Sequence, residues 1–139
     1  KTAYEMRDTM LLSSDGRELL RPVPGSWRPV NWLGRNVREL VNGDLSQIVR
    51  FDGRGLVPAA EPPVPGCRVL MTADLWGDYR DEIVCSRTID GRWTLLVLTN
   101  TAEAPGRAVT RTASREYRLW LARNLGAGYG SYFEWEDGH

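Results

Sequence analysis

The chain has 139 residues, with 18 basic and 18 acidic side chains, a formal net charge of zero and no basic tract. This balance gives no support for nucleic acid or an anionic membrane as a partner, and no apolar run approaches the roughly 20 residues that span a bilayer. The length allows one domain at most, or part of one. The 14 glycines, 8 prolines and 6 tryptophans suit a turn-rich β-protein.

Short segments in which apolar residues cluster or alternate with polar ones predict strands along most of the chain. They are residues 8–13, 18–21, 37–41, 46–51, 82–87 and 93–98. In the turn at residues 42–44, Gly43 is expected to take positive φ. The proline-rich residues 59–66 are expected to form a connector without regular structure.

The C-terminal segments extend this β pattern. Residues 115–124 fit either a short helix or a strand, and the alternation of Tyr117, Leu119 and Leu121 favours the strand. Residues 132–135 are expected to form the last strand. No long amphipathic helix is convincing anywhere in the chain, so the predicted class is all-β.

The two cysteines, Cys67 and Cys85, do not have the spacing of a metal site. Both lie in apolar, strand-like surroundings, where buried free thiols are the expected state. A disulfide between them is the alternative if the protein is secreted, and the sequence leaves that choice open.

An acidic turn runs directly into a predicted strand at residues 73–84, ADLWGDYRDEIV. Alternate oxygens of a tight turn can converge on a hard cation such as Ca²⁺, and a carboxylate at the far end can close the cage. Positions one, four, five and nine of this nine-residue loop are Asp74, Gly77, Asp78 and Glu82. We predict a calcium site formed by Asp74, Asp78, Arg80 and Glu82, with a solvated acidic hairpin without an ion as the alternative.

A second copy of this pattern lies upstream, at residues 31–41, NWLGRNVRELV. It superposes on residues 74–84 without a gap at an offset of 43 residues, so that Glu39 matches Glu82. Repeats of about 40 to 50 residues with one turn-and-strand signature each are typical of propeller blades. In this copy Arg35 replaces a carboxylate, and an Arg35–Glu39 ion pair is a hypothesis for what stands in for a metal.

These segments resemble signatures of bacterial rhamnogalacturonan lyases of polysaccharide lyase family 11. ADLWGDYRDEIV resembles the family's aD-x-x-GDwREE-[VI] signature, and NWLGRNVRELVNGDLSQIVRFDG is similar to its wWDGDllrELLd … I-x-k segment. TLLVLTNTAEAP resembles its LRIYTTTiPT strand, and REYRLWLARN its YRl-x-x-a-x-qN strand. YEM at residues 4–6, followed by LLSSDGREL, looks like the family's YEMW … lys-x-dG segment, and residues 132–133 sit where the family closes with an aromatic strand. The segments follow the family's order and extend over residues 4–135.

The resemblance implies an eight-bladed β-propeller with many calcium ions that cleaves rhamnogalacturonan I by β-elimination, in a secreted or periplasmic protein. It also implies that this chain is the C-terminal part of such a propeller, with residues 1–139 supplying roughly two to three blades. An open arc of blades leaves an unprotected edge. The remaining blades are therefore expected in the same precursor or in another chain.

The chemistry of such a lyase needs a group that neutralises the uronate carboxylate, a base for the C5 proton and help for the departing C4 oxygen. The chain departs from the family at two stretches. VPGCRVLM replaces an NGTK-x-TP stretch at residues 64–71, and LGAGYGS replaces YNQPPH at residues 125–131. The candidates that remain are Arg68 for carboxylate binding and Tyr129 for substrate binding, with ordinary surface or packing roles as the alternatives.

Two functions stay open at this stage. The chain is either a polysaccharide lyase, or part of one, acting on pectic rhamnogalacturonan, or a non-catalytic propeller module that binds carbohydrate or protein. Loss of the two cleft stretches favours the second, because the chain would keep the scaffold without the residues that line the cleft. Fold alone does not fix function.

Overall fold

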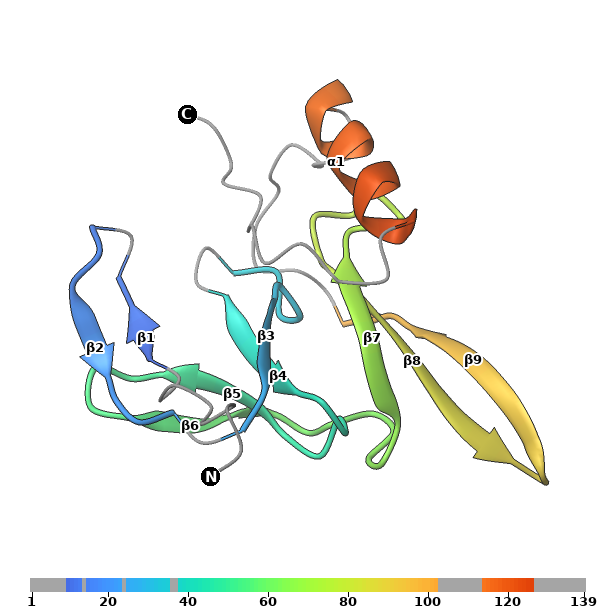
Figure 1. The fold of residues 1–139 in the computed structure, drawn as a ribbon, viewed down its shortest axis with the longest axis horizontal. Coiled ribbons are helices and arrows are strands. Elements are labelled where there is room, and N and C mark those ends of the chain that lie inside the picture. The colour runs from blue at the N-terminus through green and yellow to red at the C-terminus, as the bar shows by residue number, and fades with distance from the viewer. Residues whose placement is uncertain (1–9, 14, 24, 36–37, 103–113, 127–139) are drawn as a thin grey trace, which may run out of the picture.

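A computed structural model describes residues 10–13, 15–23, 25–35, 38–102 and 114–126. These residues form three antiparallel sheets, none of which closes on itself, and one helix (Figure 1). The prediction of an all-β fold is confirmed at this level. Of the helices in the described ranges, none is both long and apolar enough to cross a membrane.

Each strand pairs with its neighbour in sequence. The first sheet joins β1 (Leu11–Leu12) and β2 (Glu18–Leu20). The second sheet has the order β3 (Trp27–Val30), β4 (Glu39–Asn42), β5 (Ile48–Phe51) and β6 (Leu56–Ala60). The third sheet has the order β7 (Arg68–Ala73), β8 (Glu82–Ile89) and β9 (Arg92–Leu98).

The six predicted strands agree with β1, β2, β4, β5, β8 and β9 to within a few residues. Strands β3, β6 and β7 were not among them. Pro58 places β6 in a proline-rich stretch; an edge strand tolerates proline since its outer N–H needs no partner. In the turn after β4, Leu45 rather than Gly43 has positive φ, at 52°. Leu45 is fully buried, so core packing outweighs the usual glycine preference there.

The segment predicted as a strand at residues 115–124 is instead the helix α1 (Arg115–Gly126). Ser114 caps its first turn: its hydroxyl accepts a hydrogen bond from the Tyr117 N–H (3.2 Å). Leucine, arginine and alanine, which favour helices, make up much of the segment. The alternation of apolar residues was therefore misleading. The last predicted strand, 132–135, lies outside the described residues.

The second and third sheets pack face to face, with β3 beside β7 (Figure 1). The core between them contains side chains from both sheets: Val30, Val41, Leu45 and Ile48 from the second, and Val69, Ile83 and Cys85 from the third. Thr72 also donates a hydrogen bond from Oγ1 to the Pro29 carbonyl (2.9 Å), which fixes β7 against β3.

A disulfide joins Cys67, just before β7, to Cys85 in β8. The expectation of free thiols is therefore wrong. Antiparallel pairing of β7 with β8 sets Val69 opposite Cys85, which brings the preceding Cys67 within bonding reach. The bridge is fully buried in the core between the two sheets.

Candidate functional site

The acidic loop before β8 is held by a buried carboxylate. Glu82 Oε2 accepts hydrogen bonds from the backbone N–H groups of Leu75 (2.7 Å) and Trp76 (3.1 Å). Its other oxygen, Oε1, accepts one from the Thr99 hydroxyl (3.1 Å). The Glu82 side chain is fully buried, and this desolvation raises the pKa of its carboxyl group.

The loop before β4 has the same construction. Glu39 Oε2 accepts hydrogen bonds from the backbone N–H groups of Trp32 (3.1 Å) and Leu33 (3.3 Å). Glu39 is 2% exposed, and burial raises the pKa of its carboxyl group. Gly34 and Gly77 have positive φ, at 67° and 73°. The repeat at an offset of 43 residues is thus present in the geometry as well as in the sequence.

Asp74 shapes the start of the second loop. Its Oδ1 accepts hydrogen bonds from the backbone N–H groups of Gly77 (2.7 Å) and Asp78 (3.1 Å). Its Oδ2 is buried and has no hydrogen-bond partner. Desolvation, with a further contribution from the nearby negative charge of Asp81, raises the pKa of Asp74. Among the carboxylates of the described residues, Asp74 therefore has a buried oxygen without a hydrogen-bond partner.

The two loops are joined through Asn31 and Asp81. Asp81 Oδ2 accepts a hydrogen bond from the Asn31 backbone N–H (2.7 Å), and the Asp81 N–H donates to the Asn31 carbonyl (3.0 Å). Asn31 Nδ2 also donates to the Tyr79 carbonyl (2.6 Å). No pattern in the sequence marked Asp81, because its partner is 50 residues away.

The four predicted calcium ligands do not converge on one point. Asp78 Oδ2 pairs with Arg80 Nη2 (2.9 Å), and Arg80 also donates to the Ala102 carbonyl. Glu82 faces backbone N–H groups, as described above. Over the part of the chain that the structure describes, no group of three or more His, Cys, Asp or Glu residues is placed to hold a metal. Two buried oxygens of the described residues, Asp74 Oδ2 and Asn31 Oδ1, lack a hydrogen-bond partner, and the calcium site stays a prediction.

The other predicted residues are dispersed. Arg68 is exposed at the start of β7, opposite Ser86 in β8. Tyr129 lies outside the described residues. A direct Arg35–Glu39 ion pair does not occur among the described ion pairs: Glu39 Oε2 faces the backbone of its own loop, and Arg35 acts as a nearby positive charge that opposes the rise in the pKa of Glu39.

Tyr117 of α1 contacts the second loop and was not predicted to do so. Its hydroxyl oxygen accepts a hydrogen bond from the Asp74 backbone N–H (2.8 Å). In the first loop, the equivalent backbone N–H is that of Asn31, which donates its hydrogen bond to Asp81 in the second loop. Tyr117 is 1% exposed, so this end of α1 is anchored at the place where a following loop would lie.

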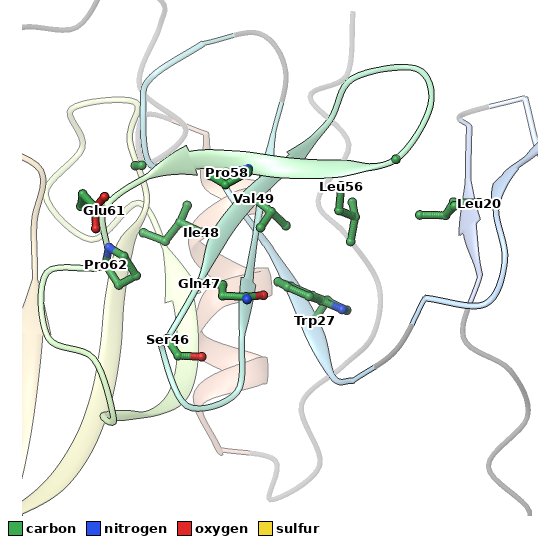
Figure 2. Close-up of a pocket in the computed structure, with 12 residues that line it drawn as sticks. Leu20, Trp27, Ser46, Gln47, Ile48, Val49, Leu56, Pro58, Glu61 and Pro62 are labelled. Carbon is green, nitrogen blue, oxygen red and sulfur yellow. The ribbon is translucent and has the colours of Figure 1, made fainter.

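A hollow of about 580 Å³ lies over the second sheet on the side away from the third. Figure 2 shows Trp27, Val49 and Leu56 facing into it from β3, β5 and β6, with Leu20 of β2 at one end. Its lining is mainly apolar, and the polar side chains Ser46, Gln47 and Glu61 lie at its margin. Such a surface is suited to apolar contact.

Comparison with protein-family models, with curated protein sequences and with solved structures finds no match to this chain. Its function therefore has to be argued from its own residues and from the motif resemblance described above.

Proposed function

We propose that this chain is a non-catalytic module of a β-propeller, made of successive blades that bind carbohydrate or protein. The observation that carries the proposal is the repeated loop. Glu39 and Glu82 each hold two backbone N–H groups of their own loop, at the same spacing in sequence. The two sheets whose first two strands these loops join pack face to face, as neighbouring blades do.

The chemistry of the loops supports a structural role. A catalytic base must reach a substrate proton, within hydrogen-bond distance or through one water. Glu39 and Glu82 are 2% and 0% exposed, and Glu39 Oε2 and both oxygens of Glu82 already accept hydrogen bonds from the protein. Their raised pKa values follow from burial, which structural networks produce as readily as active sites do.

The second candidate function is that of a rhamnogalacturonan lyase, or part of one. It is supported by the order of the motifs that resemble polysaccharide lyase family 11. In that role Arg68 would bind the uronate carboxylate, and its exposure leaves it accessible to a polymer. Calcium belongs to the same proposal, with Asp74 Oδ2 as the oxygen it would satisfy.

We further propose that the protein resides in an oxidising compartment, either secreted or periplasmic. The Cys67–Cys85 disulfide supports this location, because such bridges persist outside the reducing cytosol.

One experiment separates the two functions. The chain is incubated with rhamnogalacturonan I and calcium, and the unsaturated uronate formed by β-elimination is followed by ultraviolet absorbance. Affinity electrophoresis through the same polysaccharide measures binding. A module without catalysis gives retarded migration and no new absorbance. Absorbance that rises with wild type and is lost in Arg68→Ala would establish the lyase instead. If neither retarded migration nor new absorbance occurs, the result points to protein as the ligand.

A further inference from the structure

Strand β9, at the edge of the third sheet, carries a row of apolar side chains that stays exposed. Along β9, Trp93, Leu95 and Val97 are 69%, 50% and 44% exposed. The alternate residues Leu96 and Leu98 point the other way and pack against the core. Three large apolar side chains on one side of one strand form a patch of the kind that marks an interaction site. We call this patch the β9 face.

The repeat identifies the β9 face with a surface that is buried elsewhere in the same chain. Val41 in β4 matches Val84 in β8, and their partners on the next strands are Ile48 and Val97. Val41 and Ile48 are 0% and 1% exposed because the third sheet covers them. Val97 holds the same place as Ile48 but is 44% exposed, while Val84 on the central strand is 8% exposed, so it is the β9 face, at the edge of the sheet, that lacks the cover its counterpart has.

The hollow over the second sheet is the complementary half of that interface. The pair Leu40–Val49 in β4 and β5 matches the pair Ile83–Leu98 in β8 and β9, which packs on the second sheet. Val49 lines the hollow together with Trp27 (Figure 2). We call this surface, formed by Trp27, Val49, Leu56 and Pro58, the hollow face. It corresponds to the side of the third sheet that covers Val41 and Ile48.

We propose that the β9 face of one chain docks into the hollow face of a second copy of this chain. This inference rests on the proposed function, since it extends the contact between the two blades of one chain to blades of two chains. Both surfaces are apolar, and the zero formal net charge of the chain opposes no such contact. The occupant is a second copy because each chain carries both halves of an interface that it already forms internally.

The predicted contact is heterologous: two different surfaces meet, so each chain keeps one free half and can bind a further copy. The helix α1 leaves the β9 face accessible. Its buried Tyr117 reaches the loop at Asp74, whereas Trp93 remains 69% exposed next to the hairpin turn at Asp90.

The test is the mass of the 139-residue chain in solution, measured by light scattering after size exclusion over a range of concentrations. Wild type is expected to increase in mass with concentration. Trp93→Glu blocks the β9 face and Pro58→Glu blocks the hollow face, both at exposed positions. Each variant alone is expected to be monomeric. Their equimolar mixture is expected to form a dimer and nothing larger, because one intact half remains on each.

Arg92→Glu, beside Trp93 but with its side chain on the opposite side of β9, is the matched control and should associate like wild type. Circular dichroism checks that each variant is folded, and Leu56→Glu replaces Pro58→Glu if the latter unfolds. A wild type that stays monomeric, a single variant that still dimerises, or a mixture that does not, overturns the proposal. A monomeric wild type that unfolds cooperatively, and is destabilised when Glu39 or Glu82 is replaced, would overturn the self-association but not the proposed blade module.

Discussion

Glu39 and Glu82 make the same contact 43 residues apart: in each case Oε2 accepts hydrogen bonds from the seventh and sixth residues upstream. Both glutamates open the second strand of their sheet. A buried carboxylate is normally costly, but here it is satisfied by backbone donors that would otherwise lack partners in a tight loop. The contact therefore fixes the loop at the same end of both sheets.

Replacing either glutamate by alanine is expected to destabilise the fold. Glu39→Ala leaves the N–H groups of Trp32 and Leu33 without this acceptor, and Glu82→Ala does the same to those of Leu75 and Trp76. We expect each change to lower the free energy of unfolding by about 2–4 kcal/mol in urea denaturation.

The matched control is Glu61→Ala, at an exposed position directly after β6. There the change in the free energy of unfolding should stay within about 0.5 kcal/mol. Equal small effects for all three variants would contradict the role assigned to the buried carboxylates.

The pH dependence of stability should carry the signature of Glu39. Burial raises its pKa in the folded state, so the folded protein keeps this proton when the unfolded chain has lost it. Its contribution is fully present below the unfolded value, about pH 4.5, and is lost as the pH rises through the folded pKa. Glu39→Gln keeps an acceptor oxygen but cannot titrate. The stability of wild type relative to this variant is expected to fall as the pH rises above the unfolded value and through the raised folded pKa, and a constant difference would count against a raised pKa.

The sequence predicted the loops better than it predicted their chemistry. The gapless match of residues 31–41 to 74–84 located both loops, and the positive φ of Gly34 and Gly77 agrees with it. Spacing alone could not show that Glu82 turns back onto its own backbone, because a carboxylate at that position suits a cation equally well. A cation and the backbone N–H groups of a tight turn compete for the same carboxylate oxygens. At Glu82 the backbone N–H groups of Leu75 and Trp76 occupy Oε2.

The cysteine pair shows a different limit. Only the strand that carries Cys85 was predicted; strand β7, which follows Cys67, and its antiparallel pairing with β8 were the missing steps that would have placed Cys67 near Cys85. Opening the bridge is expected to cost about 3 kcal/mol for a sequence separation of 18 residues, through the entropy that the unfolded chain regains. Thermal unfolding with and without reductant measures this loss. The double variant Cys67→Ala/Cys85→Ala should be insensitive to reductant, and an unchanged wild type would show that the bridge does not stabilise the fold.

Calcium provides a test of the unsatisfied oxygen in the second loop. A cation bound at Asp74 Oδ2 would stabilise the native state by mass action, so the melting temperature of wild type is expected to rise with calcium concentration. The rise should be lost in Asp74→Asn. It should also be lost in Asp78→Ala if Asp78 exchanges its contact with Arg80 for the ion. Wild type that melts at the same temperature with calcium and with a chelator would exclude a stabilising site in this loop.

The helix α1 was the largest departure from the predicted elements, and its anchor makes it testable. The alternation of apolar residues predicts Tyr117 in a strand. In the structure Tyr117 lies in a capped helix, and its hydroxyl oxygen accepts a hydrogen bond from the Asp74 N–H. Tyr117→Phe keeps the ring but leaves this buried N–H without a partner. We expect a loss of about 1–2 kcal/mol in the free energy of unfolding.

Hydrogen exchange of the Asp74 amide should quicken as well, because α1 would no longer hold the loop closed. Leu119→Ala, at a position that is 47% exposed on the same helix, is the control and should leave that amide protected. Equal exchange of the Asp74 amide in wild type and Tyr117→Phe would mean that the loop is held by its own contacts, chiefly those of Glu82, and that α1 adds nothing to them.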